Sequence, residues 1–222
     1  MPRMPEFNLV QKILLMGIPI LFAITVHEVA HGWVANKLGD PTARMLGRLT
    51  LNPIKHIDPV GTLLIPAALL LLGAPFLFGW AKPVPITPQN FAKPRIGMAW
   101  VAAAGPASNL LMAIMWVAVC WMAATFGAEV PYIVPLYWMG IFGVLANVAL
   151  GVLNLFPLPP LDGSKVLAGF LPARAARAMY RVEYLGLLLV AVLLWTGILG
   201  RLLSPIIFGI TNVLLAPVPE LH

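Results

Sequence analysis

Long uncharged runs alternate with short polar stretches along this chain of 222 residues. A helix that crosses a bilayer needs about 20 apolar residues, within a range of roughly 17–25. Five runs meet this need and predict spanning helices, while a sixth, Val60–Ala81, is a doubtful span because several glycines and prolines interrupt it. The five are the run that begins at Ile13 and continues past a short polar interruption to Ala35, and the runs Ile96–Ala128, Val130–Leu161, Tyr184–Gly200 and Leu202–Pro219.

The pattern therefore predicts an all-α polytopic membrane protein with about five to six transmembrane helices. The polar stretches 36–59, 79–95 and 162–183 are too short to hold a soluble domain, so residues 1–222 are interpreted as one membrane-embedded domain. No small-residue cleavage pattern follows the first run, which argues against a removed signal peptide. Within the first polar stretch, Ala43–Leu51 partly alternates and predicts a short β element.

The composition indicates that most of the protein surface is in contact with lipid. The chain is 60% hydrophobic and 10% charged, against about 25% charged in soluble domains, and its mean hydropathy is +0.91. The net charge of +6 comes from cations in the gaps between apolar runs, which is typical of membrane topology signals and not of a nucleic-acid binder. A disulfide scaffold is excluded because Cys120 is the single cysteine.

The first run contains the motif His27-Glu28-Val29-Ala30-His31. On a helix, residues i and i+4 lie on one face, so both imidazoles can reach one metal ion with Glu28 beside them. Zinc bound in this way lowers the pKa of water from 15.7 to about 7, and a glutamate can take the proton. Three ionisable groups in a membrane helix cost roughly 2.5–3.5 kcal/mol each. A metal site explains that cost better than a chance match.

A catalytic zinc site needs a third protein ligand. Asp162 is the best candidate, because it follows a run of prolines that must break the preceding helix, and broken backbone at membrane depth is tolerated only beside protein or a wet cavity. The alternative interpretation is that Asp162 caps the next helix at the membrane interface. The other acids considered lie in polar loops or near chain or loop ends: Asp40, Asp58, Glu129 and Glu220.

The metal ligands also constrain the topology. His31 and Asp162 both lie just before basic loops, at the ends of their apolar runs, so they meet at one depth only if these two helices run parallel. This requires that Val60–Ala81 does not cross and is re-entrant or a hairpin. Eleven cations then lie on one side and three on the other, against nine and five if the run crosses. The positive-inside rule favours the first division and predicts five spanning helices, an outer N-terminus and a site that opens toward the cytoplasm.

Three motifs in order carry a family resemblance: HEVAH at 27–31, Ala104-Gly105-Pro106-Ala-Ser-Asn109, and NLFPLPPLDG at 154–163. The chain resembles the site-2 protease family of intramembrane zinc metalloproteases, and most of all its short prokaryotic branch without PDZ or CBS domains. The resemblance implies hydrolysis of a peptide bond within the plasma or inner membrane, in transmembrane protein substrates. It implies one zinc ion per chain held by His27, His31 and Asp162, with Glu28 as the catalytic acid and base.

Other polar residues have open roles at this level. The resemblance places Asn154 near the zinc, where its amide is expected to bind the substrate carbonyl or oxyanion. Asn109 and Asn147 are intramembrane amides for which helix–helix hydrogen bonding is as good a reading as a role in the site. His56 is either a further site group or an interfacial histidine. The loop 79–85 is read as an interfacial anchor, or as an exposed edge onto which an unwound substrate adds a strand.

Two other classes of function compete with a protease. A zinc transporter needs polar residues spaced along a conduction path, whereas here they converge at one depth. A silent scaffold of the same fold is expected to lack the glutamate, and Glu28 is present.

Overall fold

The protein is described by a computed structural model over residues 5–73, 79–130 and 132–221. Within these residues the chain is helical and has no strand, so the all-α prediction is confirmed. The β element expected in Ala43–Leu51 is not confirmed: a short helix ends at Met45 and buries Ala43 near Gly32 of the first helix, and turn and irregular backbone follow to Leu51. The helices are α1 (Leu9–Lys37), α2 (Thr42–Met45), the 3-10 helix η1 (Pro53–His56), the π-helix η2 (Pro59–Leu64), α3 (Ile65–Leu71), the 3-10 helix η3 (Pro88–Asn90), α4 (Pro94–Phe126), α5 (Ile133–Leu155), α6 (Asp162–Phe170), α7 (Ala173–Arg181), α8 (Glu183–Trp195) and α9 (Ile198–Leu215).

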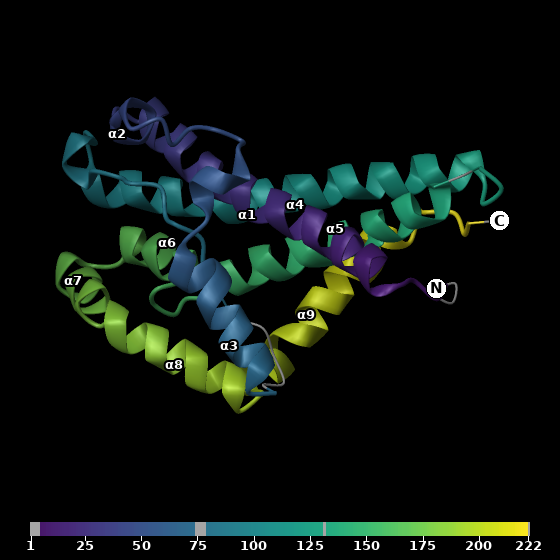
Figure 1. Ribbon diagram of the computed structural model, residues 1–222. Helices are drawn as coiled ribbons and strands as arrows, with labels where there is room; N and C mark the ends of the chain where they lie inside the picture. The colour runs from purple at the N-terminus through teal and green to yellow at the C-terminus, as the bar shows by residue number, and fades with distance from the viewer. Residues whose placement is uncertain (1–4, 74–78, 131, 222) are drawn as a thin grey trace.

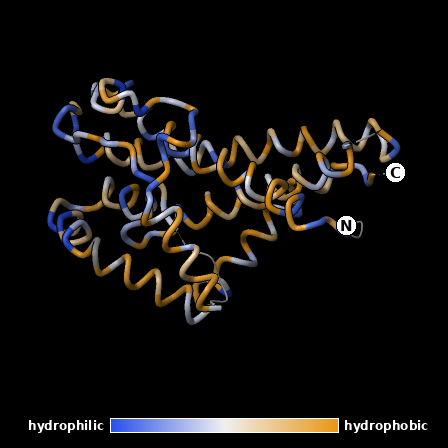
Figure 2. The backbone as a smooth tube through the Cα atoms, viewed as in Figure 1, coloured by the Kyte–Doolittle hydropathy of each residue, from blue (hydrophilic) through white to orange (hydrophobic). Residues whose placement is uncertain are grey.

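Three long helices, α1, α4 and α5, pack against one another and form the centre of the molecule (Figure 1). They contain 29, 33 and 23 residues, which corresponds to lengths of about 43, 50 and 35 Å at 1.5 Å per residue. Each is long and apolar enough to cross the roughly 30 Å hydrocarbon core of a bilayer, as is α9. Apolar residues follow these helices along their length, and polar residues gather in the loops at the end that carries α2 and α7 (Figure 2).

The segment that begins at Pro59 leaves the bundle and returns to the same level. Helices η2 and α3 carry the chain outward, and after it returns the Trp80 amide donates to the Gly61 carbonyl over 3.1 Å. The Lys82 amide likewise donates to the His56 carbonyl over 2.9 Å. Both ends of the segment therefore lie side by side, which agrees with the predicted re-entrant segment or hairpin.

The last two apolar runs differ from the expectation of two separate crossings. Helix α8 has 13 residues and a length of about 20 Å, too short to span a bilayer alone. Phe7 and Leu15 at the start of α1 share a core cluster with Leu215 at the end of α9, so the two ends of the chain lie at one end of the bundle (Figure 1). Since α5 brings the chain to the opposite end, α8 and α9 together return the chain once along the bundle. Four described helices are long and apolar enough to cross a bilayer, so the predicted count of five to six is not confirmed.

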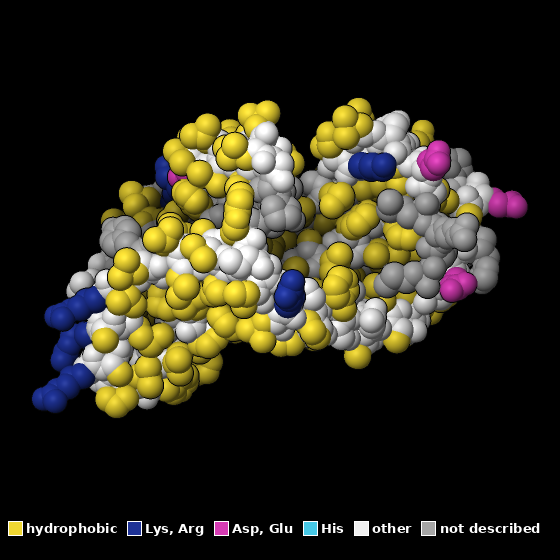
Figure 3. All heavy atoms as spheres, turned by 90° about the horizontal axis from the view of Figure 1, so that it is seen from below, with side chains coloured by type: hydrophobic (Ala, Val, Ile, Leu, Met, Phe, Trp, Pro, Cys, Tyr) yellow, Lys and Arg dark blue, Asp and Glu magenta, His cyan; other side chains and the backbone are white. Residues whose placement is uncertain are grey.

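The outer surface is mostly apolar. Hydrophobic side chains cover the face seen in Figure 3, and Lys and Arg side chains project from one end of it. Helix α7 contributes to that charge, because its three arginines are exposed while Ala176 is buried. A surface of this kind is suited to lipid around the bundle and to water or headgroups at its charged end.

Candidate metal centre

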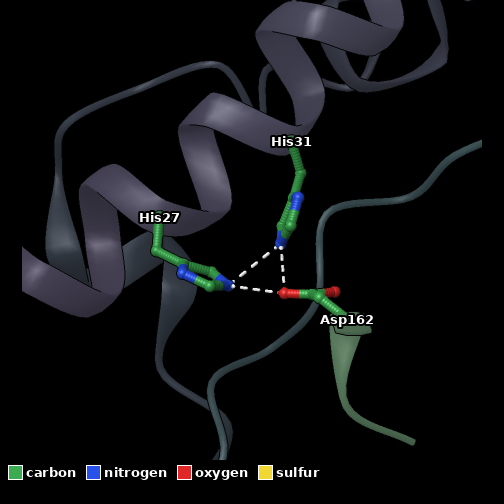
Figure 4. Close-up of side chains that lie close together, drawn as sticks. All are labelled: His27, His31 and Asp162. Atoms are coloured by element: carbon green, nitrogen blue, oxygen red, sulfur yellow. Dashed lines mark hydrogen bonds and ion pairs between the residues drawn. The ribbon is translucent and has the colours of Figure 1, made fainter. Parts of the chain in front are cut away.

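Helices α1 and α6 bring three ligand groups together. His27 and His31 lie one turn apart on α1, and their side chains are buried against α4. Asp162 is the first residue of α6, and its carboxylate turns toward both imidazoles (Figure 4). Among the described residues, these three form the one group of histidine, cysteine or acidic side chains whose ligand atoms lie close enough to share a metal ion.

The distances between the three ligand atoms fit a zinc ion. The Oδ2 atom of Asp162 lies 3.1 Å from His27 Nε2 and 3.2 Å from His31 Nε2, and the two Nε2 atoms are 3.0 Å apart. Two ligands about 2.0–2.1 Å from zinc at a tetrahedral angle are about 3.3 Å apart. The triangle is therefore close to the size that three ligands of one zinc need, and two imidazoles with a carboxylate are a donor set that zinc prefers.

The opposite edge of each imidazole is fixed by a hydrogen-bond acceptor. His31 Nδ1 lies 2.7 Å from the Val101 carbonyl, and His27 Nδ1 lies 2.6 Å from Asn109 Oδ1. Asn109 uses its amide group to donate to Ala23 O and to Asn147 Oδ1, so its oxygen is the atom that faces His27. Both Nδ1 atoms therefore carry the proton, and both Nε2 lone pairs face Asp162, which is the arrangement that supports metal binding.

Gly105 lets α4 approach the two imidazoles. A Cβ atom at this position would lie 2.5 Å from His31 Cε1 and 2.6 Å from His27 Cε1. The next residue of α4 is also in a close contact, because Gly151 of α5 packs near the Pro106 carbonyl. Gly105 is therefore a point of close helix packing, with the two imidazoles as the groups that need the space.

Asp162 reaches the site because the chain between α5 and α6 is not helical. Helix α5 ends at Leu155, and prolines follow at 157, 159 and 160. The N-cap of α6 is Leu161, and the carboxylate of Asp162 contacts His27 and His31, so the structure does not support the alternative interpretation as a helix cap. Helices α1 and α5 run parallel, as predicted, but Asp162 begins the next helix and does not end α5 (Figure 1).

Glu28 and Asn154, the two residues predicted for catalysis, are hydrogen-bonded to backbone groups. Glu28 Oε2 accepts a hydrogen bond from the Val84 amide over 2.9 Å, which ties α1 to the segment after the hairpin. Asn154 donates to the Leu150 carbonyl one turn earlier in α5.

The other candidates are engaged elsewhere. His56 is buried, and its Nε2 lies 2.9 Å from the Thr50 carbonyl. Asp58 caps η2, and Asp40 binds amide and hydroxyl groups of neighbouring loops. Sequence reasoning had no signal for the contributions of Val101 and Val84, because both act through backbone atoms that every residue possesses.

Comparisons with known proteins agree with this site. The profile of peptidase family M50 matches residues 122–197. A protein of Bacillus subtilis (strain 168) named "Putative zinc metalloprotease YwhC" is 38% identical over 192 residues, which cover 86% of this chain and 84% of that protein. The chain belongs to peptidase family M50. The predicted resemblance to site-2 proteases and the prediction of a zinc metalloprotease are thereby confirmed.

Further relatives of this M50 chain carry similar names. "Putative zinc metalloprotease Rip2" of Mycolicibacterium smegmatis is 33% identical over 183 residues, and the chain spans 66% of that protein's length. "Putative zinc metalloprotease MJ0611" of Methanocaldococcus jannaschii is 34% identical over 82 residues, 37% of this chain and 36% of that protein. No solved structure matches the chain significantly.

Proposed function

We propose that this M50 chain is an intramembrane zinc metalloprotease that hydrolyses a peptide bond in or near the transmembrane segment of a membrane protein. The observation that carries the proposal is the group of His27, His31 and Asp162, whose ligand atoms lie 3.0–3.2 Å apart within a bundle of apolar helices. The burial of this site among helices suited to lipid supports a substrate bond that lies within or beside the bilayer.

The proposed chemistry assigns one zinc ion per chain to these three residues. When bound, zinc polarises a carbonyl and lowers the pKa of water to about 7. Glu28 takes the proton of the attacking water and returns it to the leaving amine. Asn154 has a second amide hydrogen besides the one that it donates to Leu150, and we assign it to the developing oxyanion.

The segment 79–85 is proposed as the edge that receives the substrate. Trp80 and Lys82 use their amides to bind back onto the chain at Gly61 and His56. In an extended chain alternate residues point to opposite sides, so the Ala81 amide and carbonyl face away from that contact. Pro83 has no amide proton, and its carbonyl accepts a hydrogen bond from Arg48 over 3.4 Å, so Ala81 provides the pairing groups. An unwound substrate that pairs with this side forms an added strand, and unwinding is required because a helix hides its peptide bonds.

The orientation follows from charge. Of the fourteen lysines and arginines, nine lie in the α1–α4 and α5–α8 connections, and Lys37 and Arg95 lie at the adjoining ends of α1 and α4, so eleven are at the end of the bundle that holds the metal site. Positive loops face the cytoplasm. We therefore propose a multi-pass protein of the plasma or inner membrane whose site opens toward the cytoplasm.

Substitution of Glu28 tests the proposal directly. The purified protein in detergent is expected to bind about one zinc ion and to cleave a peptide that contains a transmembrane segment, while Glu28→Gln keeps the zinc and loses cleavage by at least about a hundredfold, the scale of a general base. Glu129→Gln, an exposed position between α4 and α5, is the matched control and keeps full activity. Normal cleavage by Glu28→Gln would show that the hydrolase proposal is wrong.

A further inference from the structure

Asp40 lies just after α1 and is fully buried, and the partners of its carboxylate in the described part of the chain are uncharged amide and hydroxyl groups. Its Oδ1 atom accepts hydrogen bonds from the Thr42 amide, the Thr42 hydroxyl and the Asn90 side-chain amide, over 3.1, 2.5 and 2.8 Å. Its Oδ2 atom accepts from the Thr87 amide over 2.6 Å. Burial alone would raise the pKa of Asp40, but these hydrogen bonds outweigh it and lower the pKa below its ordinary value.

All four groups around this carboxylate are donors, so the site requires an acceptor at both oxygens. An asparagine has the same shape, yet its NH₂ group would face a donor whichever way the amide is turned. A buried donor left without an acceptor costs about 1–3 kcal/mol. The arrangement is therefore specific for an aspartate. It joins the end of α1 to Thr87 and Asn90, which are 47 and 50 positions later in the chain.

The segment that Asp40 holds is the one that contacts Glu28. Val84 lies between Pro83 and Pro85, so its amide is the single N–H in the stretch 83–85, and that amide donates to Glu28 Oε2 over 2.9 Å. Thr87, which binds Asp40, follows three residues later. On the other side of Val84, Arg48 donates to the Lys82 carbonyl over 2.9 Å.

The approach of Val84 to α1 is also built into the helix. A Cβ atom at Gly32 would lie 2.8 Å from Val84 Cγ1 and 2.6 Å from Leu49 Cδ2. Gly32 lies one turn after Glu28, and the side chain of Val84 is only 6% exposed. The contact between the 82–87 segment and the Glu28 region of α1 is therefore close and buried.

We infer that Asp40 is a positioning residue for Glu28, because it fixes the 82–87 segment so that the Val84 amide holds one oxygen of the Glu28 carboxylate. This inference rests on the proposed function, in which Glu28 moves the proton of the attacking water. With Oε2 held by Val84, Oε1 is the atom left to face that water. Loss of the Asp40 contacts lets the segment shift, and Glu28 then samples several orientations. Misplacement of a catalytic group by about 1 Å is enough to lower a rate by up to about a hundredfold.

Hydrogen exchange and kinetics of Asp40→Asn test the inference together. Exchange of the Val84 amide, the single exchanging position of residues 83–85, is expected to accelerate at least about tenfold in the zinc-free and in the zinc-loaded protein, because its acceptor is no longer held. The value of kcat on a transmembrane peptide falls by about tenfold, while zinc content and KM change less than about twofold. Asp58→Asn is the matched control: its side-chain oxygen still caps η2, and exchange at Val84 and kcat stay at the wild-type value.

Val84→Pro removes the same hydrogen bond from the other side. If Asp40 acts through Val84, the double variant Asp40→Asn, Val84→Pro is no slower than the slower single variant, whereas independent effects multiply. Unchanged Val84 exchange, a wild-type kcat or multiplied losses would overturn the inference. Should Asp40→Asn not fold, Asn90→Ala removes only one of the four bonds. Wild-type kcat and wild-type Val84 exchange in Asn90→Ala, together with wild-type kcat in Val84→Pro, which has no amide proton at position 84, would also overturn the inference. Absence of cleavage by the wild-type protein would instead contradict the proposed function, and the exchange result would still decide the contact.

Discussion

His27 donates its Nδ1 proton to Asn109 Oδ1 over 2.6 Å, between helices α1 and α4 and across 82 positions of sequence. The direction of this bond is set by Asn147, because the Asn109 amide group donates to Asn147 Oδ1 and leaves only its oxygen for the imidazole. Asn147 in turn donates to the Gly143 carbonyl in α5. A chain of amides through three helices thus decides which nitrogen of His27 is free to bind a metal.

Asn109→Ala is expected to weaken zinc binding by about 10- to 100-fold, the usual effect of removing a partner behind a metal-ligating histidine. The His27 ring loses its fixed tautomer and orientation, but all three ligands remain. Zinc affinity measured by competition with a chelator checks the prediction. Asn212→Ala, at an exposed amide on α9, is the control and keeps the wild-type affinity. Wild-type affinity in Asn109→Ala would show that the Asn109 bond does not orient the ligand.

Gly105→Ala is expected to reduce zinc affinity by at least about tenfold, because a methyl group at 2.5–2.6 Å from both imidazoles forces the rings or the helix to move. The same substitution at Gly209 of α9, where no atom lies within 4 Å of the added carbon, is the matched control. Zinc content and thermal unfolding are measured for both variants. A Gly105→Ala protein with normal zinc binding would contradict the tight approach of α4.

The grouping of His27, His31 and Asp162, which we propose as the metal ligands, could be predicted from the sequence because ionisable groups stand out in apolar runs. His27 and His31 are related by helical spacing alone, and Asp162 was found from the prolines that precede it. The sequence left Asn109 open between a helix–helix hydrogen bond and a role in the site, since its partners are on α1 and α5 and depend on how three helices pack. The contacts of Val84 and Val101 could not be predicted either, because they are made by backbone atoms that every residue possesses.

The number of crossings could not be predicted from hydropathy, for a physical reason. Hydropathy identifies lengths of chain that are suited to lipid, but it does not show whether two neighbouring runs cross separately or divide one crossing. Helices α8 and α9 meet at Gly197, whose φ of 72° turns the chain without returning it to the far side of the bundle. The hairpin at 59–82 was predicted correctly, because the ligands themselves require α1 and α5 to be parallel.

Asp162→Ala is expected to lower zinc affinity by more than the roughly 10- to 100-fold that follows loss of a supporting partner, since only two protein ligands remain. Cleavage is lost with the metal. Asp58→Ala is the control. Asp58 is also an aspartate at the start of a helix, where it caps η2, but it lies outside the ligand group, so this variant keeps the zinc. Zinc content after dialysis against a weak chelator distinguishes the two variants. Normal zinc in Asp162→Ala would place the third ligand elsewhere.

The topology predicts where single cysteines can be labelled in intact cells. In a Cys120→Ala background, we place one cysteine at a time at exposed positions in four connections or ends: Gln89 after the hairpin, Ala128 between α4 and α5, Ala173 at the start of α7, and Glu220 after α9. A reagent that does not cross the membrane is expected to modify Ala128→Cys and to leave Ala173→Cys unmodified, because positive loops face the cytoplasm.

The other two positions decide the points that hydropathy left open. Gln89→Cys is expected to resist the external reagent like Ala173→Cys, because the hairpin returns the chain to the Gly61 level; modification from outside would show that Val60–Ala81 crosses. Glu220→Cys is expected to react like Ala128→Cys, because the end of α9 packs with Phe7 and Leu15 at the start of α1. Protection of Glu220→Cys in intact cells, with reaction after the membrane is permeabilised, would show that α8 and α9 cross separately and that the single return along the bundle is wrong.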